Sequence, residues 1–360
     1  YQGQPEPGIH SRNYGQQNPS NVPGTAMKVC HLVASTGLGR GDAYVDLVNA
    51  QAQYAEVCLV APYGAKFAGN LHDNVKLFEY RSSNSRFNPK LYFELYNLIR
   101  KIAPDVVHTH FAKASEIFHR LGRYLSVTHV ATKHNPRKGK IFNRLKYVVA
   151  VSQGVAESIS HDNVEVIYNG ILPEKVARRK NNNLFTVCAI GRLDKIKRFD
   201  LLIDEMAKVD GAYLLQIVCD GTEKTALEQK ITANGLDDKI KLLGFRSDVP
   251  QLLADSDLQL MSSSSEGFSL AMVEAIFYSR VFVSTRVPGC IEILPEKLMV
   301  EGTDISSKVT DVMLNYEKYV QAFQEVKGRY QNKLDIKQVA KHYIDYYKKI
   351  VLSDRFVKTE

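Results

Sequence analysis

The stretch LQLMSSSSEGFSLAMVEA, residues 258–275, joins a short apolar run to an amphipathic segment through a turn rich in serine. A short apolar run bounded by turn residues is consistent with a buried strand, and apolar residues at helical spacing predict a helix. We therefore expect a strand at 258–261, a loop, and a helix at 269–277. Such strand–loop–helix units are the building blocks of α/β proteins with parallel sheets.

The same alternation continues along most of the chain, and it is interrupted once. The interruption, YNGILPEKVARRKNNN at 168–183, is polar and contains glycine, proline and three consecutive asparagines, which is typical of a linker. Strands are expected before it at 29–34, 57–61, 106–110, 127–132 and 148–151, with helices at 41–53 and 89–102. Strands are expected after it at 185–190, 213–219, 240–243, 258–261 and 281–285, with helices at 199–209, 222–234 and 269–277.

A chain of 360 residues exceeds the size at which one hydrophobic core keeps growing, so two domains are expected. We predict an α/β fold of two Rossmann-like domains, at 27–170 and 184–334, joined by a linker at 171–183. The last segment, 335–360, begins with a predicted amphipathic helix. Residues 1–26 are polar and rich in Gly, Pro, Asn and Gln, and we expect an added leader or a disordered tail there.

Positive charge is concentrated in the predicted first domain. Residues 27–170 hold 18 Lys and Arg against 11 Asp and Glu, which gives +7 of the total net charge of +8. Basic clusters at 81–90, 100–101 and 137–146 would attract a phosphate-bearing partner or an anionic membrane surface. A merely solvated basic face is an equal alternative.

The cysteines and the hydropathy indicate the compartment. Five cysteines, odd in number and mostly set in apolar runs, are expected to be buried thiols of a reducing compartment. No apolar run approaches the roughly 20 residues that a membrane-spanning helix needs. We therefore expect a cytoplasmic protein, with peripheral attachment to the inner face of the cytoplasmic membrane as a further expectation, and no nucleic-acid partner.

Ligands of open α/β sheets bind beyond the carboxyl ends of the strands, and three loops at such positions are unusual. The first, STGLGRGD at 35–42, suits a phosphate-binding turn or simply a tight backbone turn. The second, GRLDKIKR at 191–198, places four cations in one loop and helix start. An arginine fork and a lysine point charge can hold a diphosphate from two sides, although a solvated basic turn remains the alternative.

The third loop, 262–269, contains five serines, four of them consecutive, and leads into the predicted helix at 269–277. Serine caps and exposed amides at a helix start form an anion site. Glu266 precedes the helix and Glu274 lies two turns into it, so both carboxylates can face one ligand and accept hydrogen bonds from sugar hydroxyls. Two solvated glutamates are the alternative, because this spacing is common by chance.

These loops resemble the retaining GT-B glycosyltransferases of the family-four type, whose E-x7-E motif reads S-x-x-E-G-F-G-x-x-x-x-E-A. The resemblance covers roughly residues 27–351, and it implies two domains facing across a cleft with the C-terminal helix crossing back to the first. Further matching segments follow in order: VATKH at 130–134, VAVS at 149–152, VIYNG at 166–170, GR at 191–192 with Lys197, DG at 220–221, LGFR at 243–246 and PGCIE at 288–292. The sequence departs from the family at 39–42, where G-G-x-E is frequent, and at Arg198 and Ser269, where glycine is frequent.

The resemblance implies a role for each matching position. Arg192 and Lys197 would bind the donor diphosphate, Glu266 would hold the transferred sugar, and His134 would contact that sugar from across the cleft; these four form the implied catalytic set. Glu274 would bind the ribose. The implied donor-binding set is Glu274, Gly267, Phe268, Ser269, Leu270, Phe245, Arg246, Gly37, Gly39 and Gly41.

The implied reaction is transfer with retention from a nucleotide diphosphate sugar, expected to be a UDP-sugar, to a hydroxyl of a glycan or lipid-linked acceptor. The leaving diphosphate would help to deprotonate the acceptor, so no protein nucleophile, cofactor or metal is expected. The implied setting is the synthesis of bacterial cell-surface polysaccharide or lipopolysaccharide. The alternatives are a nucleotide-sugar epimerase of the same fold and a non-catalytic nucleotide-sugar binding or assembly protein.

Two short motifs could suggest a metal. Asp255-Ser-Asp257 resembles a D-x-D motif, but it precedes a strand, where a capping or buried aspartate is usual. His108-Thr-His110 is a possible metal pair, but the sequence shows no third ligand at a suitable spacing. We therefore predict no metal site.

Overall fold

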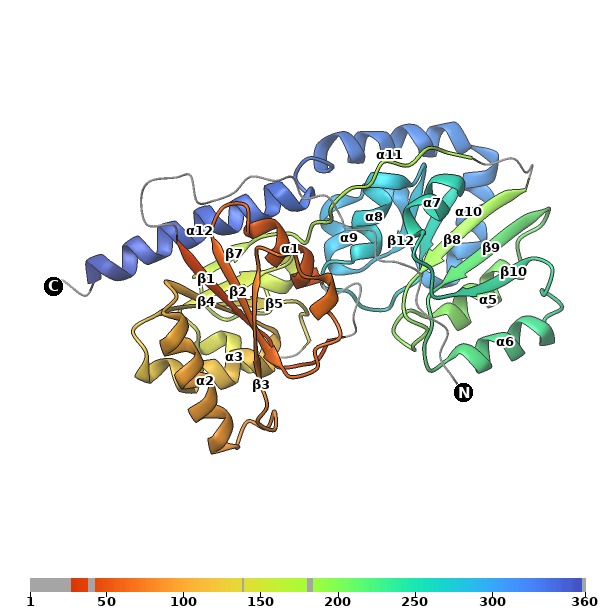
Figure 1. The fold of residues 1–360 in the computed structure, drawn as a ribbon. Helices are drawn as coiled ribbons and strands as arrows, with labels where there is room; N and C mark the ends of the chain where they lie inside the picture. The colour runs from red at the N-terminus through yellow and green to blue at the C-terminus, as the bar shows by residue number, and fades with distance from the viewer. Residues whose placement is uncertain (1–26, 38–42, 138, 180–183, 358–360) are drawn as a thin grey trace.

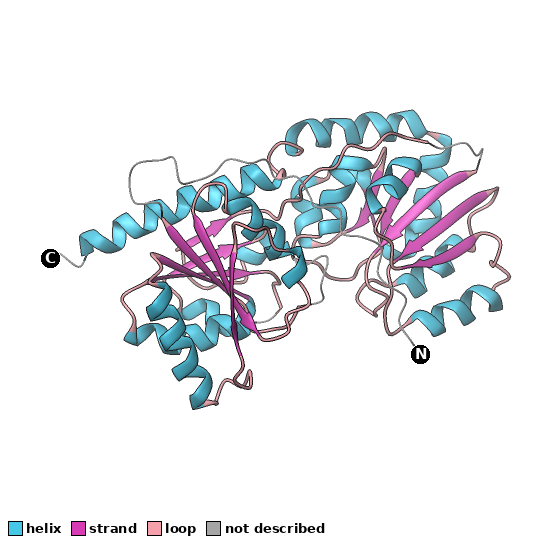
Figure 2. Cartoon of the chain, viewed as in Figure 1, coloured by secondary structure: helices cyan, strands magenta, loops and turns pink. Residues whose placement is uncertain are grey.

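A computed structural model of the chain describes residues 27–37, 43–137, 139–179 and 184–357. It contains two β-sheets that lie side by side, each with helices on both faces (Figures 1 and 2). All of the paired strands run parallel. The prediction of two Rossmann-like units is therefore confirmed.

The first sheet has seven strands in the order β3-β2-β1-β4-β5-β6-β7. Its strands are β1 (Lys28–Leu32), β2 (Glu56–Pro62), β3 (Lys76–Tyr80), β4 (Val106–His110), β5 (Thr128–Lys133), β6 (Tyr147–Ala150) and β7 (Val164–Val166). The connecting helices are α1 (Ala43–Gln51), α2 (Pro89–Ile102), α3 (Phe111–Leu121) and α4 (Gln153–Ala156), with 3₁₀ turns η2 (Ala68–Asn70), η3 (Gly122–Tyr124) and η4 (Lys140–Arg144).

The second sheet has six strands in the order β10-β9-β8-β11-β12-β13. Its strands are β8 (Phe185–Ile190), β9 (Tyr213–Val218), β10 (Ile240–Gly244), β11 (Leu258–Met261), β12 (Phe282–Thr285) and β13 (Met299–Val300). Around it lie α5 (Phe199–Met206), α6 (Lys224–Ala233), α7 (Val249–Asp255), α8 (Leu270–Tyr278), α9 (Pro288–Ile293), α10 (Ile305–Leu314) and α11 (Tyr316–Tyr330), with 3₁₀ turns η5 (Glu296–Leu298) and η6 (Gly302–Asp304).

The first sheet packs on two separate cores because successive residues of a strand face opposite sides. Val29 of β1 joins the core under α1, whereas its neighbour Cys30 joins the core under α2 and α3. The last helix, α12 (Ile336–Val357), lies on the α1 side and contributes Tyr343, Ile344 and Tyr347 to that core. The C-terminal helix therefore crosses back to the first domain as predicted (blue in Figure 1).

The structure adds elements that the sequence did not indicate: β3, β7, β13, α3, α4, α7, α9, α10 and α11. β7 has three residues and β13 has two, which is too short for a pattern to show. Helix α3 follows β4 without a break because Phe111 turns the chain with a left-handed φ of 67°. No glycine or proline marks that turn, so the sequence carries no turn signal there.

The linker and the paired aspartates are parts of one arrangement. Residues 171–179 form no helix or strand, and Arg178 pairs with Asp257 Oδ1 at 2.7 Å. The other oxygen of Asp257 accepts from the amide of Thr186, and Asp255 Oδ1 accepts from the amide of Arg179. Both carboxylates of the D-x-D motif thus hold the chain as it enters the second domain. The predicted leader at 1–26 lies outside the described residues.

Candidate functional site

Two loops of the second domain are joined at the carboxyl edge of its sheet. They follow β8 and β11, which are neighbouring strands, so their loops emerge side by side. The hydroxyl of Ser262 donates to the carbonyl of Lys197 at 2.7 Å, and the amide of Ser264 donates to the carbonyl of Ile196 at 2.8 Å. The cationic loop at 191–198 and the serine loop at 262–269 therefore form one surface.

An ion pair between Lys197 and Glu266 lies on this surface. Lys197 Nζ donates to Glu266 Oε1 at 2.6 Å, and both side chains are mostly buried, with 19% and 16% exposure. Gly191 permits this arrangement, since a Cβ there would lie 2.9 Å from Lys197 Cε. The structure thus brings together two of the four predicted catalytic residues, in a pairing that the sequence did not indicate.

Arg192 lies beside this pair but is open to solvent. Its Nε donates to Asp194 Oδ2 at 2.8 Å, and 58% of its side chain is exposed. The other oxygen of Asp194 accepts from the amides of Ile196 and Lys197. Asp194 therefore shapes the loop, while the guanidinium can still reach a ligand.

Glu274 and the start of α8 lie behind the serine loop. Glu274 is half-buried, and its carboxylate adds to the effect of burial in raising the pKa of the Cys188 thiol in β8 to about 12. Ser269 stands at the N-cap of α8, but its side chain makes no capping hydrogen bond. The expectation of serine caps here is wrong, because Ser262 and Ser264 bind the neighbouring loop instead.

The serine loop also touches the first domain at Gly267. A Cβ on Gly267 would lie 2.1 Å from the carbonyl oxygen of His134, so only glycine fits between the two backbones. The next residue, Phe268, stacks its ring on Tyr168 at 4.7 Å, and its carbonyl accepts from Asn169 Nδ2 at 3.0 Å. The serine loop is therefore set directly against the first domain.

Glu292 forms a second connection between the domains. Its two carboxylate oxygens accept from the amides of Gln153 and Gly154 at the start of α4, each at 2.9 Å. A carboxylate is favourable at a helix start. In the sequence, the only signal for Glu292 is its position in the matching segment PGCIE, which implies no role for it.

His134 follows β5 and lies at the contact with Gly267. Its ring packs on Phe111 with centroids 4.5 Å apart, and its Nε2 lies 3.4 Å from Nδ1 of His110. Burial lowers the pKa of His134 to about 4, so its ring is neutral at physiological pH. His31 lies beside His108 and His110, so the expectation that this pair has no third partner is wrong.

The remaining predicted residues are more dispersed. Phe245 and Arg246 follow the edge strand β10, with Phe245 exposed and Arg246 paired bidentately with Asp248. Leu270 is the first residue of α8. Gly37 follows β1 and has a φ of 76°, whereas Gly39 and Gly41 lie outside the described residues.

The chain is similar to known glycosyltransferases in sequence. Residues 44–175 match the family described as Glycosyltransferase Family 4, and residues 185–316 match the family described as Glycosyl transferases group 1; together the matches span more than two thirds of the chain. The chain is 25% identical over 289 residues to the lipopolysaccharide core biosynthesis glycosyltransferase LpsE of Rhizobium meliloti (strain 1021), covering 77% of this chain and 82% of the relative.

Two further similarities concern a second relative and a solved structure. The chain is 30% identical over 132 residues to N-acetylgalactosamine-N,N'-diacetylbacillosaminyl-diphospho-undecaprenol 4-alpha-N-acetylgalactosaminyltransferase of Campylobacter jejuni, covering 36% of each chain. The crystal structure of Anabaena HepE in complex with UDP-glucose superposes with a TM-score of 0.77 at 19% identity, over 90% of this chain and 100% of HepE. The fold of this chain is thus shared with the HepE structure.

Proposed function

We propose that this chain, which belongs to the glycosyltransferases that join a family 4 domain to a group 1 domain, transfers a hexose with retention from a UDP-sugar. The observation that carries the proposal is the Lys197–Glu266 ion pair with Arg192 exposed beside it, at the carboxyl ends of two neighbouring strands. Cations there can receive a diphosphate, and the carboxylate can receive the hydroxyls of the sugar attached to it.

The proposed chemistry places positive charge where negative charge develops. As the bond from the sugar to the diphosphate breaks, Arg192 and Lys197 stabilise the leaving phosphate oxygen. Lys197 has three donor hydrogens, so it can keep its bond to Glu266 while it binds phosphate. The leaving diphosphate accepts the proton of the incoming hydroxyl on the same face of the sugar, and the configuration at the anomeric carbon is retained.

The proposed donor and acceptor follow from the site and from the relatives. HepE was solved in complex with UDP-glucose. In this chain Glu274 would bind the ribose of such a donor, and the exposed ring of Phe245 would contact its base. The relatives from Rhizobium and Campylobacter act in lipopolysaccharide core biosynthesis and on a diphospho-undecaprenol substrate. We propose a lipid-linked or glycan acceptor of bacterial cell-surface polysaccharide or lipopolysaccharide synthesis.

A panel of nucleotide sugars tests this function directly. A true donor is expected to raise the melting temperature by mass action, and incubation with glycan or lipid-linked acceptors should then give a product whose anomeric configuration matches that of the donor. Activity is expected to persist with a chelator present, since Arg192 and Lys197 supply the positive charge at the phosphates. The proposal fails if no nucleotide sugar shifts the melting temperature and no product forms.

Substitutions of the two glutamates are expected to affect different quantities, namely donor affinity for Glu274 and kcat for Glu266. Glu274→Ala should weaken UDP-sugar binding by roughly 10- to 100-fold, because a charged hydrogen-bond acceptor for the ribose is lost. Glu266→Gln should lower kcat by a similar factor while changing the affinity for UDP little, because UDP lacks the sugar that Glu266 holds. Calorimetric titration with UDP and steady-state kinetics measure the two effects. Equal UDP affinities in the two variants would contradict these roles.

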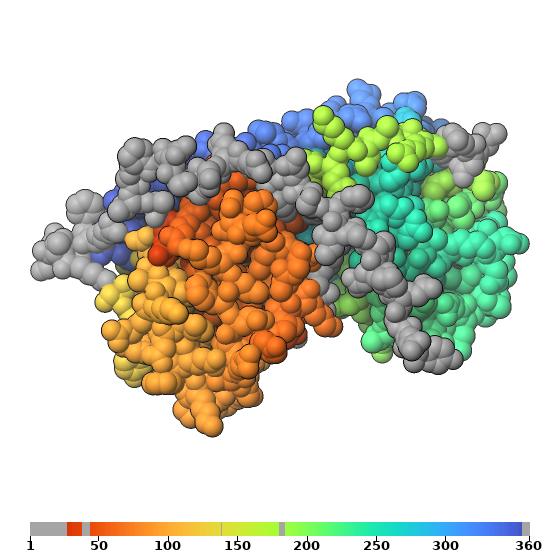
Figure 3. Space-filling model, viewed as in Figure 1, coloured from red at the N-terminus to blue at the C-terminus, as the bar shows by residue number. Residues whose placement is uncertain are grey.

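One face of the first domain suits an anionic membrane. Phe87, Phe93 and Tyr124 are 82%, 71% and 75% exposed, near a cavity of about 450 Å³ lined in part by Arg120 and Arg123. A second cavity of about 460 Å³ is lined in part by Arg86, Arg123, Lys140 and Arg144. Figure 3 shows the segment around α2, in orange, projecting from this domain. In the described part of the chain, no helix has the length and apolarity to cross a bilayer.

We propose peripheral attachment through this face, and vesicle flotation tests it. The chain should float with vesicles rich in phosphatidylglycerol at low salt and detach as salt rises. The double variant Arg123→Glu/Arg144→Glu should bind roughly tenfold or more weakly. Lys239→Glu/Lys241→Glu, with the same charge change in the second domain, serves as the control and should bind as the wild type does. Equal flotation of both double variants would contradict the proposal.

A further inference from the structure

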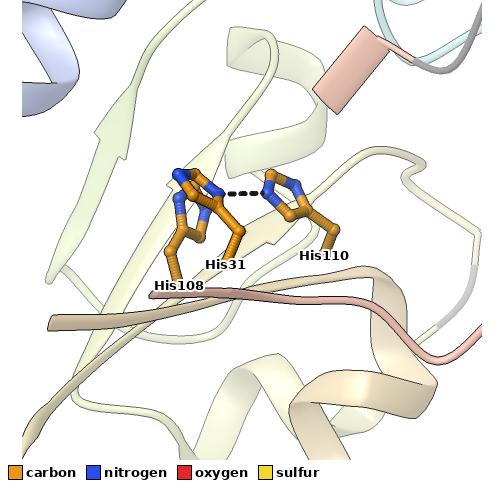
Figure 4. A group of neighbouring side chains, drawn as sticks. All are labelled: His31, His108 and His110. Carbon is orange, nitrogen blue, oxygen red and sulfur yellow. Dashed lines mark hydrogen bonds between the residues drawn. The ribbon is translucent and has the colours of Figure 1, made fainter. Parts of the chain in front are cut away.

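Three buried histidines gather in the first domain (Figure 4). Hydrogen bonds join them to Gln51 of α1 and to Tyr347 of α12. His31 belongs to β1, and His108 and His110 belong to the neighbouring strand β4. Their ligand atoms lie within 4.8 Å of one another, which is close enough to suggest a metal site. The hydrogen bonds around them support a different role.

One arm of these hydrogen bonds leads from the cluster to the domain contact. Gln51, the last residue of α1, places its Oε1 2.8 Å from His31 Nε2. His31 Nδ1 lies 2.9 Å from His110 Nε2, the bond drawn in Figure 4. His110 Nδ1 lies 3.4 Å from His134 Nε2. A continuous line of side chains therefore joins Gln51 to the residue that packs against Gly267.

The other arm leads from Gln51 to the C-terminal helix. Gln51 Nε2 donates to the Tyr347 hydroxyl at 3.3 Å, and that hydroxyl meets His108 Nδ1. His108 Nε2 lies 2.6 Å from the hydroxyl of Thr132, which in turn lies 3.3 Å from the hydroxyl of Tyr343. Gln51 is the group in which the two arms meet.

These bonds leave no nitrogen for a metal. All six ring nitrogens of His31, His108 and His110 have protein partners. A metal ion would have to break several of these bonds, and the three histidines bring no carboxylate to offset its charge in a buried place. The cluster is better described as part of a hydrogen-bonded chain.

The hydrogen bonds of such a chain all run in the same donor-to-acceptor direction, because its histidines are neutral. Burial lowers the pKa of His31 to about 4 and holds the pKa of His110 well below its usual value. A neutral imidazole has one N–H donor and one acceptor nitrogen. A ring that donates from one nitrogen must therefore accept at the other, so the direction of one bond sets the direction of the next.

The amide of Gln51 selects the direction. With its oxygen towards His31, that ring donates from Nε2 and accepts at Nδ1, and His110 does the same. His134 then donates from Nε2 and keeps a lone pair on Nδ1. The other arm agrees, because the Gln51 amide group donates to the Tyr347 hydroxyl, which is then free to donate to His108. If the amide were reversed, every bond would reverse and His134 Nδ1 would carry the hydrogen.

We propose that Gln51 and Tyr347 are positioning residues that, through His31 and His110, hold His134 in the tautomer whose Nδ1 accepts a hydrogen bond. Within the described residues Nδ1 of His134 has no protein partner, so it is left for a ligand. Its lone pair can accept a hydrogen bond from a hydroxyl of the donor sugar beside Gly267. The identity of this ligand rests on the proposed function. The assignment of the His134 tautomer is independent of that function.

Nitrogen-15 NMR of histidine side chains in the full chain tests the tautomer without any substrate. The wild type is expected to show His134 with hydrogen on Nε2 and a bare Nδ1. Tyr347→Phe removes the hydroxyl that accepts from Gln51 Nε2 and joins the amide to His108. Without this link the amide can turn over, so the two tautomers of His134 should appear in roughly equal amounts, and kcat/KM should fall about twofold with the competent population. Tyr343→Phe, the same change one turn away at the end of the other arm, should leave the tautomer and kcat/KM unchanged.

Several outcomes would overturn the proposal. Hydrogen on Nδ1 of His134 in the wild type, stoichiometric zinc in the purified protein, or a Tyr347→Phe variant that keeps the wild-type tautomer would each do so. Gln51→Met gives an independent variant that removes both contacts of the amide and should also mix the tautomers. An inactive protein with the expected tautomer would count against the proposed function and leave the chain of hydrogen bonds in place.

Discussion

Replacing Arg192 with alanine is expected to lower kcat by about 10²- to 10³-fold while the melting temperature falls by no more than about 2–4 °C. The first effect follows from the role proposed for Arg192, since a fixed cation is lost where the leaving diphosphate gains charge. The small change in melting temperature follows from the surroundings of Arg192. Its contact with Asp194 is an exposed ion pair, and such pairs stabilise a fold by about 0–1 kcal/mol.

Steady-state kinetics with the identified donor and a thermal melt measure both effects on the same preparation. Arg329→Ala provides the control, because Arg329 is an exposed arginine on α11 in the same domain. That variant should keep wild-type turnover and melting temperature. Turnover of Arg192→Ala within threefold of wild type would show that the diphosphate is held by other groups, and the mechanism proposed above would then be wrong.

The parts of the fold that the sequence predicted have local causes. Helix α2 begins and ends as expected because Asn88 caps it, Pro89 stands in its first turn, and Pro104 follows it. Strands β8 and β11 also match the predicted bounds, since each is a compact apolar run. Edge strand β3 was missed because Lys76 and Glu79 break the apolar pattern that marks a buried strand.

The candidate site was predictable in its location but not in its contacts. Topology places the loops after β8 and β11 side by side, so Arg192, Lys197 and Glu266 were expected at one edge. The ion pair between Lys197 and Glu266 depends on how the two loops close on each other, and no spacing encodes it. The same holds for the Gln51–His31 bond, which joins a helix end to a strand interior.

Gly267 belongs to the family motif, but the structure gives a reason for glycine at this position that the motif does not indicate. The family resemblance implies that its amide faces the transferred sugar. In the structure its missing side chain lets the serine loop approach His134 in the other domain, with the carbonyl oxygen only 2.1 Å from where a Cβ would be. Backbone forms this contact on both sides, so no side chain can rotate away to make room. The glycine therefore sets the position of Glu266 relative to the first domain.

Gly267→Ala is consequently expected to lower kcat by about 100-fold or more, since displacement of a reacting group by about 1 Å can cost that much. The free energy of unfolding should fall by about 1–3 kcal/mol, as for other overpacked contacts. UDP binding should change little, because Arg192, Lys197 and Glu274 all belong to the second domain. Kinetics, denaturant titration and calorimetry with UDP measure the three quantities.

Gly328 offers the matched control for this substitution. It lies inside α11, and a Cβ added there meets nothing within 4 Å. Gly328→Ala should therefore raise the free energy of unfolding by about 0.5–1 kcal/mol, because alanine loses less conformational freedom in a helix than glycine, and it should leave turnover unchanged. If Gly267→Ala behaved like Gly328→Ala, the close approach of the two domains at His134 would not persist in solution, and the sugar site could not be assembled from both domains as proposed.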